Sequence, residues 1–374
     1  MKKIPFTYIR GGTSRAVFFQ KKNLPENRDL WHEIFRRALG LSQDAHGASN
    51  TFGKQLPTNK IAVIAPSERP GFDVDYHFFQ MNEHTGIGDD RGTCGNMSSA
   101  VGPFATDHGL VPAKEGENTL RVYNINTGKT FLSTFFVKDG LAERSGEVYL
   151  PGLPEGGSPV ILEFLNPGGG YSGKLFPTGN KKDRIDCGTR GETEITLIDC
   201  VNPIVIVRAA DVGMTGKELK NEEIRPSSRN LLQMIRGKAA VLLGLVEKWE
   251  EAARTSTYIP HMAIVAEAAA YETATGEMIR KHEMDFCARA VFTKLHPTFP
   301  AGGAMATAVA AHIPGTILDG VWNRRKRFPE SPKTIIGHPG GCIEIPVEIE
   351  EEEVRKATLL RTARHLFEGE LSMD

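Results

Sequence analysis

Apolar and polar residues alternate over many short segments of this chain, and glycine or proline separates these segments from one another. The stretch Arg121-Val122-Tyr123-Asn124-Ile125 is one example, and such alternation is typical of β-strands with one face toward solvent. It does not suit the strands of a doubly wound parallel sheet, which are apolar on both faces. The predicted strands are Ile4–Ile9, Ala16–Phe19, Ile61–Ala65, Val74–Gln80, Leu120–Ile125, Lys129–Val137, Ile204–Arg208, Ala263–Ala266 and Ile343–Ile349.

Helices are fewer. They are expected over Leu30–Leu39, which Gly40 closes, from Met97 to about Thr106, from Glu222 to Glu250 with a break at Pro226, and over Gly303–Ala311. The second and the last of these consist largely of small residues. A helix of small side chains can lie inside a narrow barrel of strands, where bulky side chains would clash.

The two halves of the chain are similar around these small-residue helices. Thr93–Val101 and Ala301–Val309 each combine a glycine-containing turn with a run of Ala, Ser, Thr and Val. We therefore expect an α+β protein of two pseudo-symmetric domains, each a curved, mixed or antiparallel β-barrel around a central helix. A Gly-, Asp- and Lys-rich region places the boundary near residue 190. The domains are then 1–190 and 191–374, and the end of the chain could return to the first.

Composition narrows the classes of function. The chain has 374 residues and a formal net charge of −1, so it has no basic excess for binding a phosphate backbone, and nucleic acid is not expected as a partner. Its apolar runs are too short to cross a membrane, and no signal peptide precedes the first strand. Five cysteines without CxxC spacing argue against a disulfide framework or a zinc ribbon, and favour the cytoplasm. Neither a Walker A nor a Rossmann motif is present, so no nucleotide cofactor is expected.

The candidate chemistry begins at Cys94, between Gly92 and Gly95 and before a predicted helix. Glycine lets a backbone approach a ligand, and the first turn of a helix offers N–H groups that attract anions. A thiol in that field can exchange protons near neutral pH. A buried, inert cysteine is the commoner alternative, and we assign that role to Cys187, Cys200, Cys287 and Cys342.

Three further segments are candidates, each with a simpler alternative. Arg10-Gly11-Gly12-Thr13-Ser14-Arg15 could be an anion-binding turn or a plain hairpin turn. Lys60, before an apolar strand, could be a partly desolvated amine of lowered pKa or a solvated charge at a strand end. His338, in the turn Gly337–Gly341, could face a ligand or serve only the turn. No pair of histidines has helical metal spacing, and no metal is expected.

Taken together, several segments resemble the PrpF-like family of isomerases, which have the diaminopimelate epimerase fold. The matching segments are Arg10-Gly11-Gly12-Thr13-Ser14, Thr58-Asn59-Lys60-Ile61-Ala62, Asp73-Val74-Asp75-Tyr76, Cys94-Gly95-Asn96-Met97-Ser98-Ser99, Asn202-Pro203, Ile313-Pro314-Gly315-Thr316 and Gly337-His338-Pro339-Gly340-Gly341.

This resemblance implies two epimerase-like domains and an allylic isomerase without a cofactor. The family moves a C=C bond in unsaturated acids such as aconitate, 2-methylaconitate, oxalomesaconate and methylitaconate. Its catalytic lysine and cysteine correspond to Lys60 and Cys94. The chain departs from the family at Asn59, at Arg15-Ala16, at 46–50 and at Ala301-Gly302-Gly303, positions where substrate is expected, so the departures bear on which acid is bound.

The resulting hypothesis is a 1,3-proton transfer by Lys60 and Cys94, with carboxylates held by glycine turns and helix N-termini. The partner is a small unsaturated polycarboxylate, no membrane is involved, and a homodimer is left open. The expected substrate-binding residues are Arg10, Gly12, Thr13, Ser14, Asn59, Gly95, Asn96, Met97, Ser98, Gly302, Gly303, Ala304 and His338.

Three rival functions remain. An amino-acid epimerase of the same fold would use a second cysteine, but Gly302, Gly303 and Ala304 occupy the matching turn and cannot carry a proton. A cysteine hydrolase would pair Cys94 with His84 or His108 as base. A non-enzymatic accessory protein of an aconitase-type dehydratase would turn over no substrate.

Overall fold

A computed structural model describes residues 3–41, 58–82, 85–292, 294–322 and 333–373. The chain forms two compact units, one made of Met1–Phe164 and Leu360–Asp374 and the other of Leu165–Leu359. The expected boundary near residue 190 falls inside the second unit of this division, because β10 (Asp183–Asp186) pairs with β11 (Glu192–Cys200). The end of the chain belongs with the first unit.

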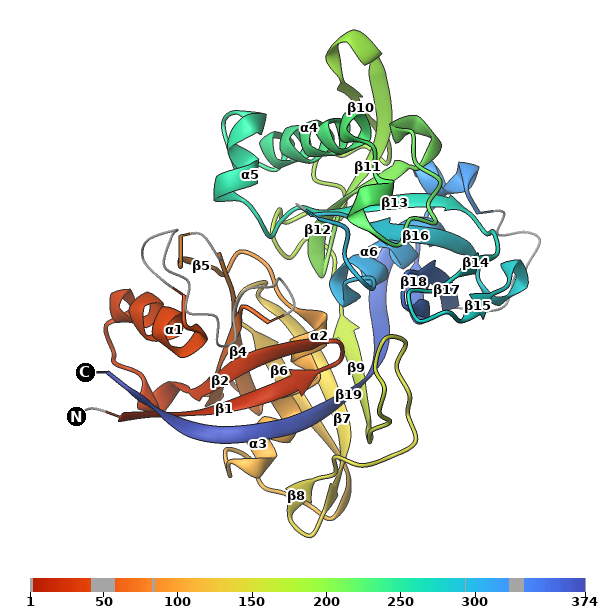
Figure 1. Ribbon diagram of the computed structural model, residues 1–374. Coiled ribbons are helices and arrows are strands. Elements are labelled where there is room, and N and C mark those ends of the chain that lie inside the picture. The colour runs from red at the N-terminus through yellow and green to blue at the C-terminus, as the bar shows by residue number, and fades with distance from the viewer. Residues whose placement is uncertain (1–2, 42–57, 83–84, 293, 323–332, 374) are drawn as a thin grey trace. The chain divides into compact units, whose positions relative to one another are not determined.

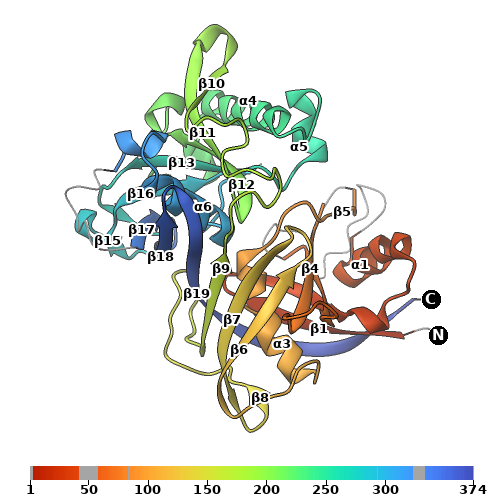
Figure 2. The same ribbon diagram turned by 180° about the vertical axis from the view of Figure 1, so that it is seen from behind.

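The first unit is a closed, mixed β-barrel. Its strands pair in a ring in which β2–β3 and β4–β6 are parallel, and the C-terminal strand β19 closes the ring between β1 and β9 (Figure 1). Figure 2 shows β6, β7 and β9 from behind. The ring consists of β1 (Lys3–Gly11), β2 (Ser14–Gln20), β3 (Lys60–Pro66), β4 (Val74–Met81), β6 (Gly116–Asn124), β7 (Lys129–Lys138), β9 (Pro159–Leu165) and β19 (Glu353–Ser372); β5 (Gly88–Asp89) and β8 (Leu141–Ala142) are short additions.

Helices cover both faces of the β2–β4 part of this barrel. Inside, α2 (Gly95–Ser98) and α3 (Val101–Asp107) pack on strands from different parts of the ring, and Phe104 contacts Phe18 at a ring-centroid distance of 5.2 Å. Outside, α1 (Trp31–Leu39) packs on β2–β4 in one buried apolar cluster. Burial on both faces explains why β2 and β3 read as continuous apolar runs.

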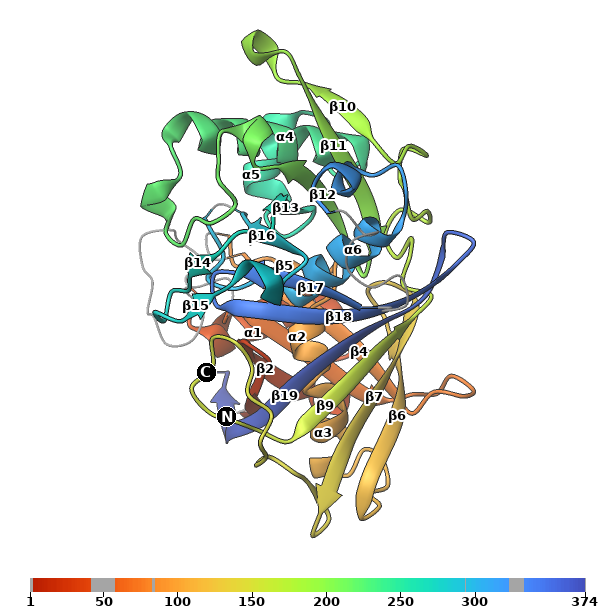
Figure 3. The same ribbon diagram turned by 90° about the vertical axis from the view of Figure 1, so that its right-hand side faces the viewer.

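The second unit repeats this plan around α6 (Ala301–His312), all of whose residues are buried. The helix packs on β11, β12 (Asn202–Arg208), β13 (His261–Glu267), β17 (Lys333–His338) and β18 (Gly341–Glu350). Figure 3 shows β17 and β18 with the first part of β19. On the other face, α4 (Pro226–Leu242) packs on an apolar cluster of the sheet. Apart from short 3-10 helices, the described part of this unit also contains β16 (Phe286–Ala290), α5 (Ala252–Thr255) and the hairpin of β14 (Tyr271–Glu272) and β15 (Met278–Ile279).

The order of strand pairings is the same in both units. From β1 to β7 and from β11 to β18, the pairs are antiparallel, parallel, antiparallel, parallel and antiparallel. The predicted α+β class and the barrel around a central helix are therefore confirmed. None of the helices in the described ranges combines the length and the apolar content that a membrane span requires.

Most predicted elements are present, and the differences have local causes. The helix expected from Met97 to about Thr106 is divided into α2 and α3, because Pro103 has no N–H for the carbonyl of Ser99, and the Ser99 hydroxyl bonds to Asn96 O at 2.7 Å. Of the long helix expected from Glu222 to Glu250, only α4 is α-helical. Prediction missed the longer strands β9, β11, β16, β17 and β19 entirely, and also the short strands β5, β8, β10, β14 and β15.

Candidate functional site

Lys60 and Cys94 meet in the first unit. Lys60 begins β3, Cys94 immediately precedes α2, and their exposed fractions are 4% and 7%. Burial lowers the pKa of Lys60, while the charge of the Cys94 sulfur and a side-chain hydrogen bond to it act in the opposite direction. The amine and the thiol are therefore neighbours, although 34 positions separate them in the chain.

A chain of amide groups orients the amine of Lys60. Gln80 lies directly opposite Lys60 in the β3–β4 register, and its Oε1 accepts a hydrogen bond from Lys60 Nζ at 2.5 Å. The Gln80 amide nitrogen donates to Asn59 Oδ1 at 2.6 Å and to Asn59 O at 3.1 Å, which fixes which end of the amide faces the lysine. Asn59 Nδ2 in turn donates to Met81 O. Asn59, predicted to bind substrate, therefore uses its side chain to position Gln80.

The turn between β1 and β2 contacts the start of α2 through Asn96. The Asn96 amide nitrogen donates to Thr13 Oγ1 at 3.0 Å and to Ser14 Oγ at 3.3 Å. Gly12 has a φ of +50°, and a Cβ there would lie 2.5 Å from Asn96 Oδ1. Only glycine fits this approach without displacement. The predicted residues of the turn and of the cysteine loop are thus one connected structure.

Arg361 is a member of this structure that sequence reasoning missed. Its Nε donates to Asn96 Oδ1 at 2.9 Å, and the residue is only 8% exposed. Burial lowers its pKa to about 10, and the charge of Cys94 acts against this lowering. A signal did exist in the sequence: in β19, Arg361 is spaced by two from Leu359 and Ala363, so the three share one face of the strand, and all three are buried.

Two predicted residues serve the local backbone. Arg10 Nη1 donates to Gly12 O at 3.0 Å, to Thr362 O at 3.2 Å and to Thr362 Oγ1 at 3.1 Å, so it holds the turn against β19. The Ser98 hydroxyl donates to Cys94 O at 3.0 Å, beside the helical bond from Ser98 N to the same oxygen. Gly95, Asn96 and Met97 form the first turn of α2, and all three are buried.

A buried phenol lies near the thiol. Tyr76 on β4 has no exposed surface, and its pKa is raised well above the ordinary value by burial and by the charge of Cys94, while Ser98 and Thr93 act in the opposite direction. The phenol is therefore protonated at neutral pH and can donate a hydrogen bond. Together with Arg361 and Lys60, it makes the surroundings of Cys94 polar.

The other predicted site residues lie in the second unit. Gly302, Gly303 and Ala304 belong to the first turn of α6, and a Cβ on Gly302 would lie 2.8 Å from Asn202 Nδ2. His338 is 3% exposed, and its Nδ1 accepts a hydrogen bond from Gly340 N at 3.1 Å. The His338 carbonyl accepts from the Tyr271 hydroxyl at 2.7 Å.

The remaining cysteines and histidines have other surroundings. All five cysteines are free, and all but the half-buried Cys342 are buried. His108, the base that a hydrolase would need, contacts Thr7 and Glu368. His84 and the segment 46–50 lie outside the described residues.

Comparison with known proteins agrees with this architecture. Residues 1–374 match the family described as PrpF protein. The chain is 34% identical to the 3-methylitaconate isomerase of Eubacterium barkeri, covering 98% of this chain and 96% of the relative. It is 33% identical to the 2-methyl-aconitate isomerase of Cupriavidus necator, again covering 98% of this chain and 96% of the relative.

Solved structures give the same result. A crystal structure of methylitaconate-delta-isomerase superposes with a TM-score of 0.80 at 34% identity, over 98% of this chain and 95% of the other. A probable proline racemase from Agrobacterium radiobacter, at a TM-score of 0.56 and 13% identity over 99% of this chain and 93% of the other, shares the fold. By full-length similarity in both sequence and structure, this chain belongs to the PrpF family.

Proposed function

We propose that this chain is an isomerase that moves the C=C bond of an unsaturated di- or tricarboxylate by a 1,3-allylic proton transfer. The relatives named above carry the names of isomerases of such acids and match nearly the whole chain. The observation that carries the proposal is the buried pairing of the Lys60 amine with the Cys94 thiol, beside the Arg361 guanidinium.

The reaction needs one proton removed at carbon and one delivered two carbons away. Removal leaves a dienolate whose negative charge spreads onto a substrate carboxylate, and reprotonation at the distal carbon completes the shift without any change in oxidation state. We assign these two transfers to Lys60 and Cys94, each contributing about 10²–10⁴-fold. The lowered pKa of Lys60 supports this assignment, because an amine that titrates nearer neutrality exchanges protons more readily.

Charge on the carboxylate requires fixed donors. We assign this role to Arg361 and to the backbone amides of Gly95, Asn96 and Met97, which begin a helix and lack a carbonyl partner one turn before them. The hydroxyl groups of Thr13 and Ser14, which accept hydrogen bonds from Asn96 Nδ2, lie beside these donors. In the second unit, we keep the amides of Gly302 and Gly303, at the start of α6, and the ring of His338 as proposed substrate-binding groups, whereas Ala304 N already donates to Pro300 O at 2.8 Å.

The identity of the acid is best found by direct assay. The purified protein is incubated in deuterated water with isomers of aconitate, 2-methylaconitate, 3-methylitaconate and oxalomesaconate, and proton NMR follows both the double-bond position and the carbon that gains deuterium. One of these acids should isomerise and acquire deuterium at an allylic carbon. Absence of turnover on every acid tested, or α-proton exchange on amino acids instead, would overturn the proposal.

The assigned roles are tested with Cys94→Ser and Lys60→Met. Each variant should lose at least about 10²-fold in turnover. If Cys94→Ser keeps more than about a tenth of the turnover, the thiol does not transfer a proton. Cys187→Ser is the matched control, because its buried sulfur donates to Ile185 O and belongs to the second unit.

A further inference from the structure

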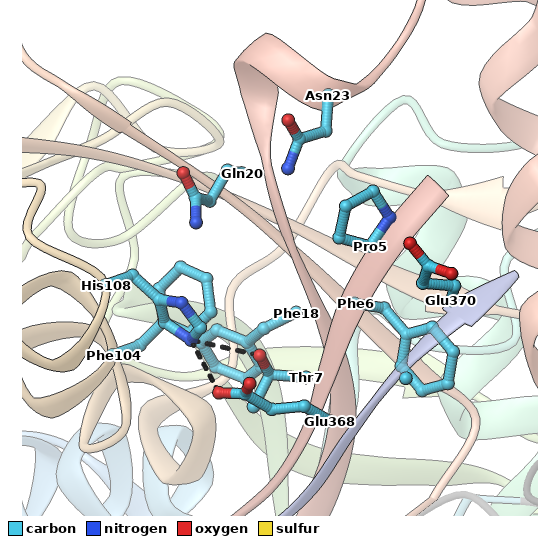
Figure 4. Close-up of a pocket in the computed structure, with 11 residues that line it drawn as sticks. Pro5, Phe6, Thr7, Phe18, Gln20, Asn23, Phe104, His108, Glu368 and Glu370 are labelled. Carbon is cyan, nitrogen blue, oxygen red and sulfur yellow. Dashed lines mark hydrogen bonds and ion pairs between the residues drawn. The ribbon is translucent and has the colours of Figure 1, made fainter. Parts of the chain in front are cut away.

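A second polar cluster lies in the first unit, where the end of α3 meets the C-terminal strand. His108 caps the end of α3, and His365 and Glu368 follow on β19. Their ligand atoms, one from each residue, all lie within 4.8 Å of one another. Figure 4 shows His108 and Glu368 next to each other, joined by a dashed line, among the residues that line a pocket of about 340 Å³.

The separations within this cluster fit a shared metal ion. His365 Nε2 lies 3.2 Å from Glu368 Oε1, and His108 Nε2 lies 3.6 Å from the same oxygen. Zinc bonds of about 2.0–2.2 Å in a tetrahedral site place neighbouring ligand atoms about 3.3–3.5 Å apart. The 3.6 Å separation is an ion-pair distance, and His108 Nε2 also lies 3.0 Å from Thr7 Oγ1.

The ring of His365 lies between two carboxylates. Its Nδ1 is 3.9 Å from Asp107 and its Nε2 is 3.2 Å from Glu368 Oε1, so Asp107 lies behind this histidine as the outer partner of a metal-binding histidine does. Asp107 is itself held, because it accepts from Ala142 N at 2.7 Å and from Arg144 at 3.1 Å. His108 is half-buried at the end of α3, and its Nε2 faces Glu368 Oε1.

We propose that His108, His365 and Glu368 bind one divalent transition-metal ion of the zinc class. Two imidazoles and one carboxylate suit Zn²⁺, Co²⁺ or Ni²⁺ rather than Mg²⁺ or Ca²⁺, which prefer oxygen ligands. Three protein ligands leave the fourth position of a tetrahedral site for water. Thr7 Oγ1, 3.0 Å from His108 Nε2, gives up this contact when the metal binds. The ion ties the strand that closes the barrel to the helix inside it.

The test is metal binding by the full-length protein after treatment with a chelator. Titration with Co²⁺ should give one tight equivalent with visible absorption bands of a four-coordinate site, and Zn²⁺ should displace it. Glu368→Gln and His365→Asn should each weaken binding by at least about 10-fold. Asp107→Asn, a change in a positioning residue, should weaken it by about 10–100-fold.

The matched control is Glu370→Gln. Glu370 lines the same pocket on the same strand, but it pairs with Lys3 and lies outside the cluster. The Glu370→Gln variant should bind Co²⁺ with the affinity of the unaltered protein. Because the Glu368 side chain is exposed, the Glu368→Gln variant should fold normally, and a loss of Co²⁺ binding in it then reports the loss of a ligand. Three results would overturn the proposal: no stoichiometric binding, equal affinity in Glu368→Gln and Glu370→Gln, or a cobalt–thiolate absorption band that assigns the metal to a cysteine.

Discussion

At the scale of single residues, the central feature is an ammonium-forming side chain buried inside a β-barrel. Taking a charged amine out of water costs free energy, which the Gln80 carbonyl oxygen, the Cys94 sulfur and the face of Phe78, 5.3 Å from Nζ, offset in part. This explains why its pKa falls. A residue that is unfavourable for folding and placed beside a thiol is typical of an active site.

Lys60→Met tests this cost through the pH dependence of stability. Because the folded pKa of Lys60 is lowered below 10.5, the unfolded chain binds more protons between the folded pKa and 10.5. The unaltered protein should therefore gain free energy of unfolding relative to the variant as pH rises through that window. Urea unfolding of both proteins at about pH 7 and about pH 10 measures the difference. A difference that is constant or changes in the opposite direction would contradict the lowered pKa.

Gln80 is a positioning residue, and its role predicts two separable effects. Gln80→Leu removes the acceptor of Lys60 Nζ and should lower kcat by about 10–100-fold with a smaller effect on KM. Gln80→Glu keeps an acceptor but adds a negative charge, so it should raise the pKa of Lys60 and move the corresponding limb of the pH–rate profile to higher pH. Gln20→Leu, the same change at the end of β2, is the control and should leave kcat unaltered. An unshifted profile in Gln80→Glu would show that Gln80 does not act through Lys60.

At the scale of elements, the sequence predicts a strand or helix correctly where its apolar pattern lies within one continuous segment. The strands β1–β4, the αL glycine that ends α1, and the buried small-residue helix α6 were all predictable from period and composition. The partners of Lys60 and Asn96 were not. Gln80 meets Lys60 through strand register and Arg361 meets Asn96 across 265 positions, and such contacts are set by the tertiary fold.

The turn between β1 and β2 shows how one element determines the shape of the site. Gly12→Ala should destabilise the fold by about 1–2 kcal/mol because of its positive φ. It should also lower kcat/KM by at least about 10-fold, because the new Cβ displaces Asn96 and Arg361. Gly109→Ala is the matched control, with a φ of +63° and no atom within 4 Å of the added Cβ. Urea unfolding of both variants measures the cost of the strained backbone, and steady-state kinetics measures the effect of displacing Asn96 and Arg361. Equal kcat/KM values for Gly12→Ala and Gly109→Ala would contradict the argument.

At the scale of the whole molecule, one strand serves both units. The first part of β19 pairs with β18 from Val347↔Ala357 to Glu350↔Glu353, and its later part pairs with β1 from Gly11↔Ala363 to Lys3↔Ser372. The first unit is therefore completed only by the last residues of the chain. Sequence reasoning missed this strand because apolar Leu360, Leu366 and Phe367 are exposed while charged Arg361 is buried, which breaks the alternation of apolar and polar residues.

Ending the chain after Leu359 separates the two roles of β19. The first unit loses the strand between β1 and β9 together with Arg361, whereas the second unit keeps every β18–β19 pair. Amide hydrogen exchange should therefore show lost protection in β1 and β2 and retained protection in β11–β13 and α6, since open strand edges exchange readily and a buried helix does not. Isomerase activity should be absent. If β1 and β2 stay protected in the shortened chain, the barrel does not depend on its C-terminal strand; if α6 also loses protection, the two units fold as one.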